Sequence, residues 1–170
     1  MKEPRSPKTP KKQKAAKSEI KYERAPELDP FIDKVRTKYL QHFTPEQHGS
    51  IEKAKFVGIF RFPEKSRGGK TVFGSARKVS DKERIFVDAD FIIEVWKDFW
   101  TNGSTTPEEK EKEALIFHEL KHCVYKEKVD KKTGNITYMP KLVPHDFEGF
   151  IKEYELFGDW TGDLPEAFSK

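Results

Sequence analysis

The chain has 170 residues, of which 36% are charged, 35% hydrophobic and 13% aromatic, and its formal net charge is +4. This length favours one domain whose core is large enough to fold alone, which leaves no room for a second catalytic domain. No apolar run approaches the roughly 20 residues of a membrane span, and no apolar signal segment follows the basic N-terminus. The single cysteine, Cys123, excludes a disulfide framework and a four-cysteine zinc site. We therefore expect a monomeric cytoplasmic protein that contacts no membrane, in which any metal ligands are His, Asp or Glu.

Residues 1–27 are expected to form a disordered basic arm. Residues 1–17 contain seven Lys or Arg and one Glu, so they carry +6 and leave −2 on the remainder of the chain. Three prolines and the lack of large apolar side chains mean that this segment buries too little surface to offset its ordering entropy. Its lysines are candidate contacts to DNA phosphates: Lys8, Lys11, Lys12 and Lys14. The alternative is a solubilising tail that contacts nothing specific.

The first half of the domain, which is expected over residues 28–160, combines helices with strands. Apolar residues at helical spacing predict a helix from Asp29 to about Phe43. The apolar segments 54–62 and 71–79 flank the turn PEKSRGGK and predict a β-hairpin. Residues 84–90 predict a third strand, and residues 90–100 predict a second helix.

The second half of the domain is predicted to contain two more helices separated by an extended segment. Thr106 is the expected N-cap of a helix whose first turn holds Pro107 and three glutamates, which the helix dipole favours there. This helix is expected to continue through ALIFHELKHCVY, residues 114–125. Residues 135–144 predict extended structure, residues 144–158 a last helix, and residues 161–170 a tail. These elements together predict an α+β fold.

Two histidines in HELKH, His118 and His122, are separated by one helical turn. At about 100° per residue they lie on one side of the helix, opposite the apolar residues around Leu120. Imidazoles at this spacing can both reach one zinc ion at about 2.0–2.1 Å. Glu119 between them is then the expected general base, next to the metal-bound water without being a ligand. The motif therefore predicts a zinc site with a hydrolytic centre.

A third zinc ligand is expected near the start of the last helix. His145 is the favoured candidate, and Glu148 is the alternative, because a catalytic zinc usually has three protein ligands and one open position. Asp146 suits a role in orienting a liganding imidazole. Asp146 and Glu148 could instead act only as acids in the first helical turn.

A group that stabilises the developing oxyanion is less well defined by the sequence. Lys121, Tyr125 and Tyr138 are candidates for this role or for substrate contact, with packing or surface positions as the simpler interpretation. His42 and His48 lie beside a helix end and a turn, and we assign them no function.

The segment FHELKHCVY, followed 23 residues after His122 by HDFEGFIKEYELFG, resembles the phage metallopeptidase family and, more distantly, SprT-like zincins. The resemblance covers about residues 56–160 and implies a minimal zincin-like fold, with a short, mostly antiparallel sheet, an HExxH helix and a closing ligand helix. It implies zinc ligands at His118, His122 and His145 and a general base at Glu119. The chain departs from the family pattern at Phe117, where acids are common, and at Lys121, where Cys is common.

These observations predict a zinc-dependent metallopeptidase, encoded by a phage and acting on protein or peptide substrates in the host cytoplasm. Two alternatives remain: a catalytically inactive zincin that binds another protein, and a DNA-associated protein that functions through its basic N-terminal arm. The sequence specifies no cleavage preference.

Overall fold

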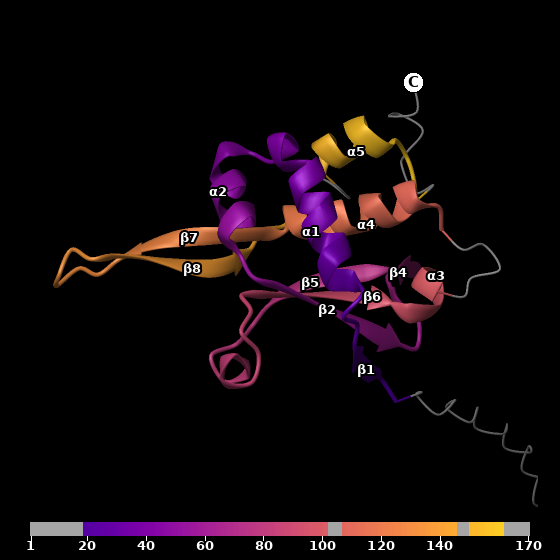
Figure 1. The fold of residues 1–170 in the computed structure, drawn as a ribbon, viewed down its shortest axis with the longest axis horizontal. Helices are drawn as coiled ribbons and strands as arrows, with labels where there is room; N and C mark the ends of the chain where they lie inside the picture. The colour runs from indigo at the N-terminus through magenta and orange to yellow at the C-terminus, as the bar shows by residue number, and fades with distance from the viewer. Residues whose placement is uncertain (1–18, 102–106, 146–149, 162–170) are drawn as a thin grey trace, which may run out of the picture.

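The computed structural model describes residues 19–101, 107–145 and 150–161, which form an α+β domain (Figure 1). The helices are α1 (Leu28–Lys38), α2 (Pro45–Lys53), α3 (Lys97–Thr101), α4 (Glu109–Lys121) and α5 (Ile151–Phe157). The strands are β1 (Lys21–Arg24), β2 (Phe56–Phe62), β3 (Lys65–Arg67), β4 (Lys70–Val72), β5 (Gly74–Lys78), β6 (Phe91–Trp96), β7 (Cys123–Val129) and β8 (Ile136–Leu142). None of the described helices combines the length and the apolar character needed to cross a membrane.

A four-stranded sheet in the order β1-β2-β6-β5 forms the base of the domain. β2 and β6 pair in parallel, whereas β1 and β5 are antiparallel to their neighbours. The predicted direct pairing of segments 54–62 and 71–79 is wrong, because β6 lies between β2 and β5. The turn between these segments instead forms its own small hairpin, β3-β4.

The prediction of a helix over residues 90–100 is also wrong for its first part, because Phe91–Trp96 is the central strand β6. Five of its six residues, including Glu94, are buried, so both faces are covered and the segment lacks the alternation of apolar and polar residues that would identify a strand. Its β-branched residues favour a strand. The preceding residues 84–90, predicted as a strand, form a short 3-10 turn and a loop.

Helix α1 packs directly on β2. A Cβ atom at Gly58 would lie 2.3 Å from Leu28 Cβ, so only glycine permits this close approach. Asp29 Oδ1 accepts the Gly58 backbone N–H at 2.9 Å and fixes the start of the helix on the strand. The first helix is confirmed over Leu28–Lys38, and a 3-10 turn, Leu40–His42, follows it.

Helix α4 is enclosed on nearly all sides. It begins with a capping box formed by Glu108 and Glu111, while the predicted cap, Thr106, lies outside the described residues. Eight of its residues are buried, including Glu119 and Lys121, so it lacks the single apolar face that the sequence predicted. The helix ends at Lys121 rather than continuing to Tyr125.

A two-stranded antiparallel ribbon, β7-β8, follows α4 and extends away from the body of the domain (Figure 1). β8 confirms the extended structure predicted for residues 135–144. The last helix, α5, begins at Ile151, so His145 lies before the helix rather than on it.

The sequence analysis also missed β1 and α2. β1 lies within the segment expected to be a disordered arm, so ordered structure begins before Leu28. α2 was missed because its sequence PEQHGSIEK is polar, although Thr44 and Gln47 form a capping box at its start. Residues 1–18, with the lysines proposed to contact DNA, and residues 162–170 lie outside the described part of the chain.

Candidate metal centre

Three imidazoles converge at the C-terminal end of α4. His118, His122 and His145 each offer one nitrogen, and these nitrogens all lie within 4.8 Å of one another. The Nε2 atoms of His118 and His145 are 3.0 Å apart. Two nitrogens bound tetrahedrally to one zinc ion at normal bond lengths are separated by roughly 3.3 Å. The spacing of the rings therefore approaches that of a ligand set.

Helix α4 sets the first two of these rings. His118 lies in its last turn, and His122 is its C-cap residue with φ −72° and ψ −21°. Because this backbone is still helical, His122 keeps the i, i+4 relation to His118 although the next residue begins a strand. The two ring centroids are 5.2 Å apart.

The other ring nitrogens of α4's histidines face oxygen acceptors. His118 Nδ1 lies 2.7 Å from Glu153 Oε2, and His122 Nδ1 lies 2.7 Å from the backbone oxygen of Val143. A carbonyl or carboxylate oxygen only accepts, so each Nδ1 carries the proton and donates it. Each neutral ring then presents the lone pair of Nε2, as a metal-ligating histidine does.

Glu153 on α5 is a site residue that the sequence analysis missed. It is 5% exposed, and its second carboxylate oxygen accepts the Trp160 indole N–H at 2.7 Å. We had assigned an orienting role to Asp146 and kept Glu148 as an alternative ligand, and both residues lie outside the described part of the chain. The sequence contains several acids on either side of α5, and only the fold distinguishes the one that reaches His118.

The pKa values of the two α4 histidines are shifted in opposite directions. Burial lowers the pKa of His118, but the hydrogen bond that His118 donates to Glu153 and nearby carboxylate charge outweigh it, so that the pKa is raised. Burial lowers the pKa of His122 below its ordinary value, which favours the neutral imidazole. Protons and metal ions compete for imidazole nitrogens, so a metal bound here must displace any proton on His118 Nε2.

Phe150 closes one side of the cluster. Its ring is edge-on to all three imidazoles, with centroid distances of 5.4 Å to His118, 4.9 Å to His122 and 5.2 Å to His145. Because Phe150 is 3% exposed, it keeps this side of the histidines dry. A dry boundary strengthens the electrostatic interactions of groups in the site.

Glu119 lies against the edge strand β5. Its carboxylate accepts the backbone N–H of Ala76, and a Cβ atom at Gly74 would lie 2.9 Å from Glu119 Oε1. Burial raises the pKa of Glu119 to about 7, although the charge on His118 opposes this shift. A carboxylate with a pKa near neutrality can both accept and release a proton at physiological pH.

The candidates for oxyanion or substrate contact have other contacts. Lys121 Nζ donates to Gln47 Oε1 at 2.9 Å, and Gln47 Nε2 donates to the Lys121 carbonyl at 2.6 Å, which ties α4 to α2. The hydroxyl of Tyr125 donates to Asp90 at 2.5 Å. Tyr138 is 66% exposed on the ribbon strand β8. Tyr125 is therefore held within the domain, and Tyr138 lies on the surface.

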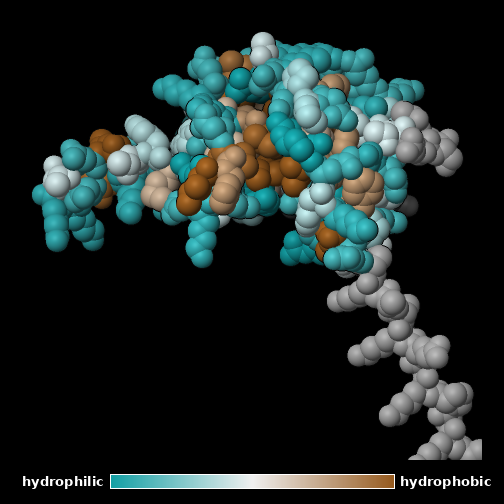
Figure 2. Space-filling view, turned by 60° about the horizontal axis from the view of Figure 1, so that its bottom comes forward, coloured by the Kyte–Doolittle hydropathy of each residue, from teal (hydrophilic) through white to brown (hydrophobic). Residues whose placement is uncertain are grey.

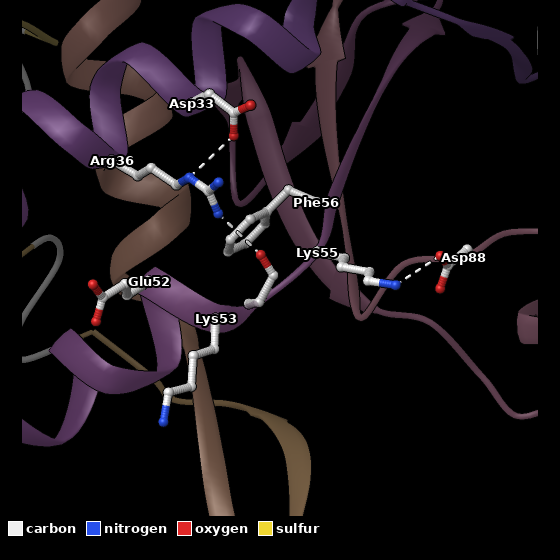
Figure 3. Close-up of a pocket in the computed structure, with 8 residues that line it drawn as sticks. Asp33, Arg36, Glu52, Lys53, Lys55, Phe56 and Asp88 are labelled. Carbon is white, nitrogen blue, oxygen red and sulfur yellow. Dashed lines mark hydrogen bonds and ion pairs between the residues drawn. The ribbon is translucent and has the colours of Figure 1, made fainter.

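Two surface hollows lie elsewhere and contain no histidine. One, of about 360 Å³, is lined by Tyr22, Ile59, Arg77 and Glu94. The other, of about 300 Å³, lies beside α1 and α2 (Figure 3). In the second hollow Arg36 pairs with Asp33 and donates to the Ala54 carbonyl, while Lys55 pairs with Asp88. These charges neutralise one another, so this hollow offers weaker chemistry than the histidine cluster.

Comparisons with known proteins identify the family of this chain. Neither the curated proteins nor the solved structures give a match. A family model described as "Putative phage metallopeptidase" matches residues 20–169, which include all the elements described above. The chain therefore belongs to this family of metallopeptidases.

Proposed function

We propose that this protein is a zinc-dependent peptidase, encoded by a phage, in which His118, His122 and His145 hold the metal ion and Glu119 is the general base. The observation that carries this proposal is the convergence of three imidazole nitrogens beside a buried glutamate with a near-neutral pKa. The substrates are proteins or peptides, as the family implies.

The donor set fits zinc. Three neutral imidazole nitrogens are typical of catalytic zinc sites, in which a fourth position stays open for water or substrate. Hydrogen bonds from Nδ1 of His118 and His122 to fixed oxygens hold both rings in the tautomer that a metal needs. A bound zinc ion supplies Lewis-acid chemistry, which polarises a peptide carbonyl and makes water more acidic.

Glu119 is positioned for proton transfer. It neighbours His118 in the sequence, and the Ala76 N–H orients its carboxylate. We assign it the acceptance of a proton from the attacking water and the delivery of this proton to the leaving amine. His118 and His122 would hold the metal ion, and the Phe150 ring beside them excludes water from one side.

The test combines metal analysis with digestion of an unbiased peptide library. We expect about one zinc ion per chain in the wild type and in Glu119→Gln, because Glu119 is not a ligand. Glu119→Gln should lower cleavage by about 100- to 10 000-fold, the usual contribution of a general base. Glu127→Gln is the matched control, since it makes the same chemical change on the exposed ribbon.

The outcomes separate this proposal from its alternatives. Zinc binding without cleavage by the wild type would support an inactive zincin that uses its site for architecture. Cleavage that survives in Glu119→Gln would exclude Glu119 as the base. Absence of zinc from the wild type, even after reconstitution, would exclude the metal site itself.

A further inference from the structure

The β7-β8 ribbon has two chemically different faces. Cross-strand partners in an antiparallel pair share a face, and successive residues alternate between faces. One face carries Lys126 opposite Met139, Lys128 opposite Thr137, and Lys141 opposite Val124. The other face carries the exposed apolar side chains Val129, Ile136, Tyr138 and Leu142.

The ribbon's lysines are exposed and grouped together. Lys126, Lys128 and Lys141 on the strands and Lys131 and Lys132 in the turn are all exposed. Within the described part of the chain, no carboxylate lies within ion-pairing distance of any of these five lysines. In the body, several basic residues pair with acids: Lys34 and Lys38 with Glu113, Lys55 with Asp88, and Lys97 with Glu23. Exposed body lysines that form no such pair are spread over separate elements, as in α2 and α4, whereas those of the ribbon lie together.

The ribbon's own acids do not neutralise the lysine face. Glu127 is on the opposite face, and Asp130 in the turn accepts the backbone N–H of Lys132 at 2.7 Å. Five lysines against these two acids give residues 123–142 a net charge of +3. This positive charge stands clear of the body, where Figure 2 shows the ribbon as a projecting arm with hydrophilic side chains along it.

We infer that the lysine face of the β7-β8 ribbon binds the phosphate backbone of a nucleic-acid duplex. Seven paired residues make the ribbon about 20–24 Å long, and a two-stranded ribbon fits a major groove about 12 Å wide. Flexible ammonium groups on one face can contact several phosphates, which are a dense line of negative charge. This binding is a property of the ribbon alone and does not depend on peptidase activity.

The arrangement of the two faces favours nucleic acid over a membrane. A ribbon that inserts Ile136 and Tyr138 among lipids would point Lys126, Lys128 and Lys141 away from the anionic headgroups. Membrane-binding elements instead keep their cations near the headgroups while their apolar side chains insert. A duplex contacts only the lysine face, so it requires no such conflict.

The test measures binding of the full chain to a fluorescent duplex of about 20 base pairs across a salt series of about 50 to 200 mM. The ribbon variant combines Lys126→Gln, Lys128→Gln and Lys141→Gln. Each lost phosphate contact should reduce the magnitude of the slope of log K against log salt by about one. For the triple variant we therefore expect this slope to fall in magnitude by about 2–3 and the affinity to fall by about tenfold or more.

The matched control removes the same charge from the body through Lys53→Gln, Lys82→Gln and Lys110→Gln. These lysines are exposed, and no carboxylate in the described part of the chain pairs with them. Residues 1–17 are present in every protein, so their contribution is constant. Control and wild type should bind alike. An equal loss in both variants, or no loss in the ribbon variant, would overturn the inference.

Competitors identify the partner. Single-stranded DNA, poly-glutamate and anionic vesicles are added at equal charge, and each should compete less well than unlabelled duplex. Stronger competition by any of them would contradict the inference and identify that competitor as the preferred ligand.

A lysine acetylation footprint on the wild-type protein provides a second readout that needs no variant. Duplex should protect Lys126, Lys128 and Lys141 and leave Lys53, Lys82 and Lys110 reactive. The reverse pattern would locate binding on the body.

Discussion

The parts of the chain before and after α4 hold the candidate metal centre in different ways. Before α4, the sheet and α1 are packed through buried residues, and β5 holds the Glu119 carboxylate through Ala76. After α4, Val143, which directly follows β8, and Glu153 on α5 provide the oxygens that accept from His122 and His118. The first part therefore positions the proposed base and stabilises the domain, whereas the second part orients the proposed metal ligands. Changes in the two parts should affect different measurements.

Among the changes that test this comparison, Gly74→Ala is expected to have the largest effect, because it acts on the proposed base from the first part. The new Cβ would lie 2.9 Å from Glu119 Oε1, 3.0 Å from Leu115 Cδ1 and 3.2 Å from the Glu94 carbonyl oxygen. The carboxylate is the group most able to move, and a displacement of about 1 Å can cost about 100-fold in rate. We expect kcat to fall by about this factor while zinc content stays at the wild-type level.

Peptide cleavage and metal analysis on the same preparations check this prediction. Gly49→Ala is the control, since nothing lies within 4 Å of a Cβ atom at this glycine. Loss of zinc from Gly74→Ala would mean that β5 shapes the ligands as well as the base.

Glu153→Ala tests the second part of the molecule. It removes the acceptor for His118 Nδ1, and the loss of such an orienting partner usually weakens metal binding by about 10- to 100-fold. Competition with a chromophoric chelator measures the affinity. Glu155→Ala is the matched control, because this exposed glutamate lies on the same helix and pairs with Lys152. Equal metal affinities for both variants would show that Glu153 does not orient His118 for metal binding.

The His118–His122 pair could be predicted because its geometry is local. Two imidazoles one helical turn apart share a side of any helix, whatever the helix packs against. His145 could be proposed from the need for a third ligand, but the sequence placed it on a helix that in fact begins at Ile151. Its position depends on where β8 ends, which is a tertiary property.

The partners of the histidines could not be predicted because they depend on the fold. Val143 contributes a backbone oxygen, which no residue type identifies, and Glu153 is one acid among several near α5. β6 was misread for a related reason. Burial on both faces removes the alternation that identifies a strand, so Phe91–Trp96 matched helical spacing by its apolar content alone.

Glu113→Gln should change stability without changing the metal centre, since this α4 residue contacts Lys34, Lys38 and Tyr39 in the first part of the chain. Burial raises the pKa of Glu113, but hydrogen bonds from Lys38, Tyr39 and Lys34 outweigh it and hold the pKa below its usual value. A depressed carboxyl pKa stabilises the fold above the unfolded value of about 4.3, and this contribution is lost as the pH falls further.

We therefore expect Glu113→Gln to lower the free energy of unfolding by about 1–2 kcal/mol at neutral pH, with a smaller difference from wild type below about pH 4. Urea unfolding across this pH range measures both values. Glu109→Gln is the control, because Glu109 also pairs with Lys34 but is 67% exposed. A difference that stays constant with pH would assign the effect to packing rather than charge.

Shortening the ribbon should have the smallest effect on the metal centre. The variant replaces residues 127–138 by Asn-Gly, so that a two-residue turn joins Lys126 to Met139, which are cross-strand partners. The base of the ribbon remains, including the Tyr125 backbone N–H bond to Ser50 Oγ at 2.9 Å.

In the shortened protein, Val143 still forms two hydrogen bonds with His122. The Val143 carbonyl accepts from His122 Nδ1 at 2.7 Å, and the Val143 backbone N–H donates to the His122 carbonyl at 2.8 Å. We therefore expect zinc affinity within about twofold of wild type, well below the effect of an orienting partner's loss. Chelator competition measures the zinc affinity of this variant in the same experiment as that of Glu153→Ala. A tenfold loss would show that the outer ribbon maintains the orientation of His122, and the second part of the molecule would then control the ligands over its full length.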